Sequence, residues 1–449
     1  MSSRYSDCRG LAVTASCAGA VAAYDLFVRR FLAHGADAAA RLKATMEADP
    51  GLVLGHCARG FCALILGRYE LRKAAREALA AARQSLAERG GTERERLYVA
   101  ALATFCDGSF TGAAGILDQV LDADPLDAYA AKLVHAIRFM AGDPSGMLRS
   151  TARLLPAWTE QVPDAGYVLG CHAFGLEETG DCAAAESYGR RAVALGRDDA
   201  WTLHAVAHVL EMRDQPEAGV AWLDSGAADL SRTGNLAFHV AWHKALFLLE
   251  LGEIDRVLEI YDREVRAQQT DDFRDISNGV SLLARLEGEG VDVGDRWDEL
   301  IDKAARRTAD TALVFAALHY LAALLAGRRW REVEDQLAAM EQAAAGDGDQ
   351  ARLFASVGLP FARALAESWR TGHGKPALAL AELLPRIAAI GGSHAQRDVF
   401  FRMTVDRLEA AGQTAAARDL LRGRLVRRPG NRWGRSRLAR LAAVAPQAA

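Results

Sequence analysis

The sequence predicts an all-α protein: a tetratricopeptide-like helix-turn-helix solenoid, right-handed and continuous over residues 1–449. Three observations predict it. Apolar residues recur at helical spacing in most segments. Alternating runs rich in Val, Ile and Thr, which would indicate strands, are nearly absent. Short breaks return about every 34 to 40 residues, the period of a helix-turn-helix unit, which gives roughly ten to twelve helix pairs.

The repeat is clearest in three stretches, 167–195, 238–265 and 314–340. Each reads as an apolar helix, a short turn and a second helix. A small residue at the turn lets the first helix reverse into the second. We expect equivalent turns at Gly180, Asp214, Gly252, Gly288 and Gly327. One helix pair cannot bury its apolar face alone, so neighbouring pairs must stack.

Two polar stretches, 343–350 and 371–376, predict longer turns within the array and not linkers between domains. The stretch 357–365 places Gly and Pro at an expected helix start. In 391–400, Ser393 follows two glycines and is expected to cap a helix. Free backbone amides and Arg397 at that helix start could also form an anion site.

The charge balance argues against a nucleic-acid partner. The chain has 54 Lys and Arg against 58 Asp and Glu, a net charge of -4, whereas nucleic-acid-binding domains are usually basic. Residues 418–449 form a basic end, which we expect to be a structural cap and not an RNA or anionic-lipid patch. No apolar stretch is long enough to span a membrane. Seven cysteines without a CxxC pattern indicate a reducing compartment, so we expect a cytoplasmic protein.

Histidines gather in the expected first helices of the pairs. The members of this group are His56, His135, His172, His204, His208, His239, His243 and His319. Positions four apart differ by about 40° around a helix, and positions seven apart by about 20°. His204, His208 and Glu211 therefore form one stripe, and His239 and His243 form another on the next first helix. Because first helices line the concave surface of such solenoids, the two stripes are expected to share one inner site.

Three interpretations of this site stay open. Imidazoles and a carboxylate could chelate a divalent transition metal, with Zn, Fe or Mn favoured over Ca. They could instead bind a small polar ligand, which leaves open whether the protein is an enzyme. They could also hydrogen-bond one another and fix the superhelix. The candidate metal ligands are His204, His208, Glu211, His239 and His243. The candidate ligand-binding set also contains Asp275, Arg397 and Asp398.

Several of these stretches resemble the tetratricopeptide repeat protein 38 family. They are 198–212, 285–297, 357–360 and 391–400, and the order of elements is similar over nearly the whole chain. The resemblance implies an all-α repeat superhelix in a soluble protein, and it implies no particular reaction. The positions that match the family pattern are His204, His208, Glu211, His239, His243, Arg397 and Asp398.

The sequence thus favours a cytoplasmic solenoid with a His/Glu/Asp-lined concave pocket for a small polar ligand or a metal. The alternative is a protein-interaction scaffold whose groove takes a peptide or partner protein, with structural histidines. Peptide-clamping grooves rely on Lys, Arg and Asn, which grip carboxylates. A floor rich in histidine therefore favours the small pocket.

Overall fold

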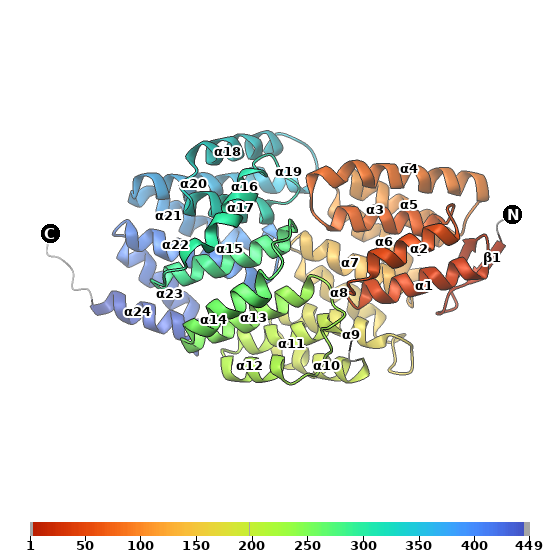
Figure 1. Cartoon of the computed structure of the whole chain (residues 1–449), viewed down its shortest axis with the longest axis horizontal. Coiled ribbons are helices and arrows are strands. Elements are labelled where there is room, and N and C mark those ends of the chain that lie inside the picture. The colour runs from red at the N-terminus through yellow and green to blue at the C-terminus, as the bar shows by residue number, and fades with distance from the viewer. Residues whose placement is uncertain (1–2, 197, 444–449) are drawn as a thin grey trace. The chain divides into compact units, whose positions relative to one another are not determined.

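The structure is a computed structural model that describes residues 3–196 and 198–443 (Figure 1). By its contacts the chain forms two compact units. Unit 1 comprises Met1–Val206, Gly226–Val240 and Asp347–Gln350, and unit 2 comprises Ala207–Ser225, Ala241–Gly346 and Ala351–Ala449. Three helices contribute residues to both units: α11 (Ala200–Met212), α13 (Leu236–Leu251) and α19 (Asp349–Leu353). A single continuous array over 1–449 stays a prediction.

The other helices of unit 1 follow one another in ten elements. They are α1 (Ala18–Leu32), α2 (Ala38–Ala48), α3 (Val53–Ile65), α4 (Arg72–Arg89), α5 (Glu93–Cys106), α6 (Phe110–Ala123), α7 (Ala128–Met140), α8 (Pro144–Leu154), α9 (Ala165–Glu178) and α10 (Cys182–Leu195). Consecutive helices pack as pairs, and first helices also contact one another, as α3 does with α5 and α7 with α9. This is the packing expected of stacked helix pairs.

The remaining helices of unit 2 are α12 (Pro216–Asp224), α14 (Ile254–Ile260), α15 (Phe273–Gly288), α16 (Asp298–Ala305), α17 (Val314–Ala326), α18 (Trp330–Ala344), α20 (Leu359–Thr371), α21 (Gly374–Leu383), α22 (His394–Ala410), α23 (Thr414–Arg427) and α24 (Arg432–Ala443). Short 3₁₀ or π segments are η1 (Tyr69–Leu71), η2 (Tyr261–Val265), η3 (Gly294–Trp297), η4 (Phe354–Gly358) and η5 (Leu384–Ile390). Four helices pack in a closed ring, because α15 contacts α17 and α22, and α20 also contacts both. Phe354, Phe361 and Phe400 are fully buried among them.

A short hairpin that the sequence did not predict precedes the helices of unit 1. Strand β1 (Ser3–Ser6) pairs antiparallel with β2 (Ala12–Ala15). Glu95 of α5 holds the second strand, accepting hydrogen bonds from Thr14 N at 2.9 Å and Thr14 Oγ1 at 2.8 Å. Arg94 pairs with Asp7 at 3.2 Å and with Asp127 at 2.7 Å. Contacts to distant helices therefore stabilise strands too short to show a sequence pattern.

The expected turns are largely confirmed. Gly180, Asp214 and Gly252 have left-handed backbone, with φ of 97°, 55° and 77°. Gly327 also lies in its expected turn, as the residue that follows α17, and Arg328 is the left-handed residue there. The expectation at Gly288 is corrected, because Gly288 is the last residue of α15 and the left-handed residue of that turn is Gly290.

The helix start expected in 357–365 is confirmed for α20, which begins at Leu359 with Gly358 before it and Pro360 in its first turn. Helix α19, the π segment η4 and helix α20 follow one another without a break, so Pro360 lies within a continuous helical run. A π turn directly before the proline gives its ring room in the helix, where a proline also lacks the backbone N–H. The turn expected at 371–376 is confirmed, since Gly372 ends α20 with φ of 65°. The turn expected at 343–350 is confirmed between α18 and α19.

All eight histidines expected in first helices lie in α3, α7, α9, α11, α13 and α17, as the sequence predicts. Across residues 3–196 and 198–443, no helix is both long enough and apolar enough to cross a membrane.

Candidate functional site

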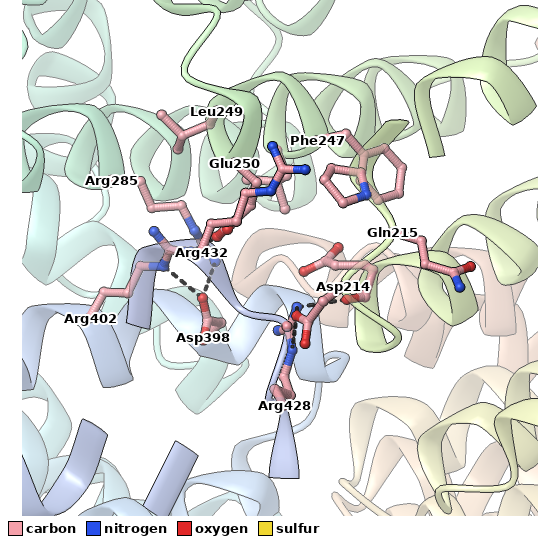
Figure 2. A pocket seen from close by; sticks show the side chains of 14 residues that line it. Asp214, Gln215, Phe247, Leu249, Glu250, Arg285, Asp398, Arg402, Arg428 and Arg432 are labelled. Atoms are coloured by element: carbon pink, nitrogen blue, oxygen red, sulfur yellow. Dashed lines mark hydrogen bonds and ion pairs between the residues drawn. The ribbon is translucent and has the colours of Figure 1, made fainter. Parts of the chain in front are cut away.

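The centre of the site in unit 2 is a carboxylate surrounded by arginines. Asp398 lies in the first turns of α22, and its side chain is 9% exposed. Its Oδ2 accepts from Arg402 Nε at 2.8 Å, one helical turn later. Arg424 of α23 pairs with the other oxygen, and Arg285 Nη2 of α15 lies 3.6 Å away. Figure 2 shows Asp398 pointing toward Arg402 and Arg285. Three helices are thus joined through one carboxylate.

The network continues through Glu250, on the part of α13 that belongs to unit 2. Its carboxylate accepts from Arg402 Nη2 at 2.9 Å, from Asn431 Nδ2 at 3.3 Å and from the Trp433 backbone N–H at 3.2 Å. Glu250 therefore holds the connection between α23 and α24 in place.

Arg428, in that same connection, reaches the turn between α11 and α12. Its Nε donates to Asp214 Oδ1 at 3.0 Å, and its Nη2 donates to the Glu211 backbone oxygen at 2.6 Å (Figure 2). Arg432 pairs with Glu217 nearby. The expectation that the basic end is a structural cap is consistent with these ion pairs, because Arg428 and Arg432 are paired with carboxylates of the same unit.

These side chains line a small cavity. Its wall includes Glu211, Asp214, Glu250, Arg285, Asp398, Arg402, Arg428 and Arg432. The cavity volume is only about 20 Å³, which is room for one water molecule and not for an organic ligand. As it stands, the site can hold a water or an ion among fixed charges.

Burial and neighbouring charges shift the pKa values in this network. Burial alone would raise the pKa of Asp398, but Arg424, Arg402 and Arg285 outweigh it and hold the pKa well below its usual value. Burial lowers the pKa of Arg285 to about 10, although Asp398 opposes the shift. Burial raises the pKa of Glu211, more than the positive charge of Arg428 lowers it. Asp398 is thus the firmly ionised member, and Glu211 is the one that holds a proton more readily.

Glu211 links this network to a histidine pair in unit 2. His243 Nδ1 lies 3.2 Å from Glu211 Oε2, a contact that needs one proton between the two atoms. The rings of His208 and His243 have centroids 4.4 Å apart and are inclined by 62°. Both histidines are fully buried. The predicted association of Glu211 with histidines of two helices is therefore present in this unit.

A second histidine pair lies in unit 1. His204 Nε2 and His239 Nε2 are 3.1 Å apart, and their ring centroids are 4.9 Å apart. His204 is buried and also lies against Trp201 and Phe174, with ring centroids 5.0 and 5.7 Å away. A ligand distance of about 2.0–2.1 Å would hold two adjacent nitrogens of one metal ion roughly 2.9–3.4 Å apart. The His204–His239 spacing suits such an ion as well as it suits a hydrogen bond.

Asp275 and Arg397, two other candidates, lie outside the cavity lining. Asp275 Oδ2 accepts from Thr270 Oγ1 at 2.6 Å, and burial raises its pKa to about 6. Arg397 folds back on its own helix start, donating to the Gly392 carbonyl oxygen and lying 3.3 Å from His394 Nδ1. Their role in ligand binding stays a prediction.

The cap expected at Ser393 is confirmed. Its hydroxyl accepts from the Gln396 N–H at 3.2 Å, and the Gln396 side chain accepts from the Ser393 N–H at 3.0 Å. This reciprocal pair satisfies two backbone donors of α22.

Sequence reasoning missed four members of the network: Glu250, Arg402, Arg424 and Arg428. Arg402 could have been found, because it follows Asp398 by one helical turn on the same face. The other three carry no local signal, since their partners lie far away along the chain.

Comparisons with known proteins add little to this picture. No family model matches the chain. A solved structure of Naa15/Naa10 bound to HypK-THB contains a chain that is similar, with 13% sequence identity and a TM-score of 0.26. The match covers 94% of this chain and 66% of that chain, so this chain spans just under two thirds of its neighbour's length. The helix pairs described above show by themselves that the protein is an all-α helical solenoid.

Proposed function

We propose that this solenoid binds divalent transition metal ions at the histidine pairs of α11 and α13, His204–His239 in unit 1 and His208–His243 in unit 2. The observation that carries the proposal is the 3.1 Å separation of His204 Nε2 and His239 Nε2. Two imidazole nitrogens that share an ion at ordinary ligand distances lie about this far apart. The sequence spacing places His208 one turn from His204, and His243 one turn from His239, as repeated ligands on a helix require.

Three features favour an ion over an organic ligand. His204, His208 and His243 are buried, and imidazole binds metal ions in its neutral form. Glu211 supplies an oxygen 3.2 Å from His243 Nδ1, and imidazole with carboxylate suits Zn, Fe or Mn. The cavity beside Glu211, about 20 Å³, is too small for an organic molecule.

The test is metal analysis of protein purified without a histidine tag, followed by titration with Co²⁺, whose visible spectrum reports nitrogen ligands. His204→Gln and His208→Gln are each expected to weaken metal binding at the pair to which the histidine belongs by at least about tenfold, because each removes a ligand. His319→Gln is the matched control: it is a buried histidine in a first helix, with Nδ1 2.8 Å from the Phe315 carbonyl oxygen.

The alternative is a structural role for the histidines in a protein-interaction scaffold. In that case the wild-type protein binds no Co²⁺ at micromolar concentrations, and the His204 and His208 variants lose only thermal stability. That combination would contradict the metal proposal. Equal metal binding by all variants would contradict it as well.

A further inference from the structure

A second candidate site lies in unit 2, at the ends of the four helices that pack in a ring. Two hollows there share one wall, formed by Trp369 of α20 and Arg407 of α22. The first hollow has a volume of about 280 Å³ and the second about 620 Å³. Together they reach the size of ordinary small-molecule sites, unlike the water-sized cavity beside Asp398.

The shared wall carries a guanidinium that is not paired with a carboxylate. Arg407 is half-buried and stacks on the Trp369 ring, with its guanidinium carbon 4.8 Å from the ring centroid. Burial lowers the pKa of Arg407, although Asp406 opposes the shift. The Asp406 carboxylate itself pairs with Arg437. Among the described residues, Arg407 takes part in no ion pair, so its N–H donors are available.

The second hollow adds further donors. Arg328, in the turn before α18, is exposed and also takes part in no described ion pair. Arg370 is already committed, since it pairs with Glu334 and stacks on Trp330 at 5.1 Å. Among the residues that the structure describes, no carboxylate lines this hollow. The available groups, Arg407 and Arg328, are both cationic donors, so the complementary ligand group is an anion that accepts hydrogen bonds.

The first hollow has a different character. Its apolar wall is formed by Trp297, Met403, Ala322 and Ala326. Two carboxylate side chains, Glu287 and Asp406, also line it. A compact hydrocarbon group fits such a wall, whereas a second negative charge would meet these carboxylates.

We infer that the two hollows bind a monocarboxylate with a compact apolar body. The carboxylate accepts hydrogen bonds from Arg407, and Arg328 adds positive charge at the same end. The apolar body lies against Trp297 and Met403. A free branched-chain carboxylic acid and the C-terminal leucine of a peptide both present this chemistry.

The experiment is calorimetric titration of the full chain with 4-methylvalerate, with its primary amide, and with the peptide Gly-Gly-Leu. The acid is expected to bind and the amide to bind at least about tenfold more weakly, because a charged hydrogen-bond partner is lost. If the natural source is a peptide, Gly-Gly-Leu binds more tightly than the free acid. If the source is a free acid, the order reverses. 3-Methylglutarate, which has a second carboxylate, is expected to bind more weakly than 4-methylvalerate.

Two variants distinguish the effect of the Arg407 charge from the effect of its packing on Trp369. Arg407→Met keeps an unbranched chain on Trp369 and removes the guanidinium, so it is expected to weaken 4-methylvalerate binding by at least about tenfold. Arg363→Gln is the control, because Arg363 is an exposed arginine of α20 that pairs with Glu341 and lines neither hollow. Circular dichroism verifies that both variants are folded. The inference is overturned if the amide binds as well as the acid, if Arg407→Met binds like wild type, or if none of the probes binds.

Discussion

Replacing Asp398 with Asn tests how much the arginine cluster of unit 2 contributes to stability. Asparagine keeps the size of the side chain but removes the charge that Arg402, Arg424 and Arg285 surround. Removing one partner of a buried ion pair usually costs about 3–5 kcal/mol, because the other charge stays buried. Against a total stability of about 5–15 kcal/mol, that is a large fraction.

The remaining contacts of the arginines place the expected loss at the lower end of this range. Arg402 keeps Glu250 at 2.9 Å, and Arg285 still donates to the Ala395 carbonyl oxygen at 2.8 Å. Arg424 keeps only a neutral partner, Asn431 Oδ1 at 2.8 Å. We therefore expect Asp398→Asn to lower the free energy of unfolding by about 3 kcal/mol.

Urea unfolding followed by circular dichroism measures this change. Asp419→Asn is the matched control, because Asp419 is 72% exposed and pairs with Arg422 on the surface of α23. It should change stability by less than about 0.5 kcal/mol. A loss below about 1 kcal/mol for Asp398→Asn would refute the claim that the cluster depends on this charge.

The same variant has a defined pH dependence. The pKa of Asp398 is lower in the folded protein than in the unfolded chain. The contribution of Asp398 to the free energy of unfolding is therefore fully present above its pKa in the unfolded chain, which is near 4. This contribution is lost as pH falls toward the pKa in the folded protein. The difference in stability between wild type and Asp398→Asn should therefore be constant from about pH 5 to 8 and shrink below about pH 4. A difference that grows on acidification would contradict the argument.

Two further predictions concern His319 and the basic end. Burial lowers the pKa of His319 to about 4. As pH falls, this histidine therefore binds a proton in the unfolded chain before it does so in the folded protein. The free energy of unfolding of wild type should decrease by about 3 kcal/mol between about pH 6.5 and pH 4. His319→Gln should remove that part of the pH dependence of urea unfolding, and an unchanged profile would contradict the assignment. Arg428→Gln should cost about 3 kcal/mol because Asp214 loses its partner, whereas the exposed Arg427→Gln should cost less than about 0.5 kcal/mol. Equal losses in the two variants, or RNA binding abolished by either, would argue against a structural cap.

Local sequence patterns predicted most of the fold, because helices and turns depend on neighbouring residues. The spacing of apolar residues and the small turn residues located the helix pairs. The position of Ser393 after two glycines correctly predicted a helix cap. The hairpin was not predictable in this way, since Thr14 depends on Glu95, which is 81 positions away. The start of α20 near Pro360 was predictable, but the π segment that joins it directly to α19 was not.

The candidate site was predictable only in part, for the same reason. The helical spacing correctly suggested that Glu211 lies beside a histidine of the next first helix, and it identified Asp398 as a candidate. It could not show that Asp398 is enclosed by arginines. Arg428 and Asp214 are 214 positions apart, and nothing in either segment identifies the other as its partner.

This separation has a consequence for synthesis of the protein in the cell. The ribosome releases Asp214 and Glu250 long before it adds Arg402, Arg424 and Arg428, so the nascent chain carries these carboxylates without their arginines. Premature termination before Thr414 would leave Asp214 without an ion-pair partner and Asp398 without one of its three, in a shortened unit that lacks α23 and α24. Such shortened products should be recognised by chaperones and proteases as unfinished, which makes completion of this cluster a natural checkpoint for release of the folded chain.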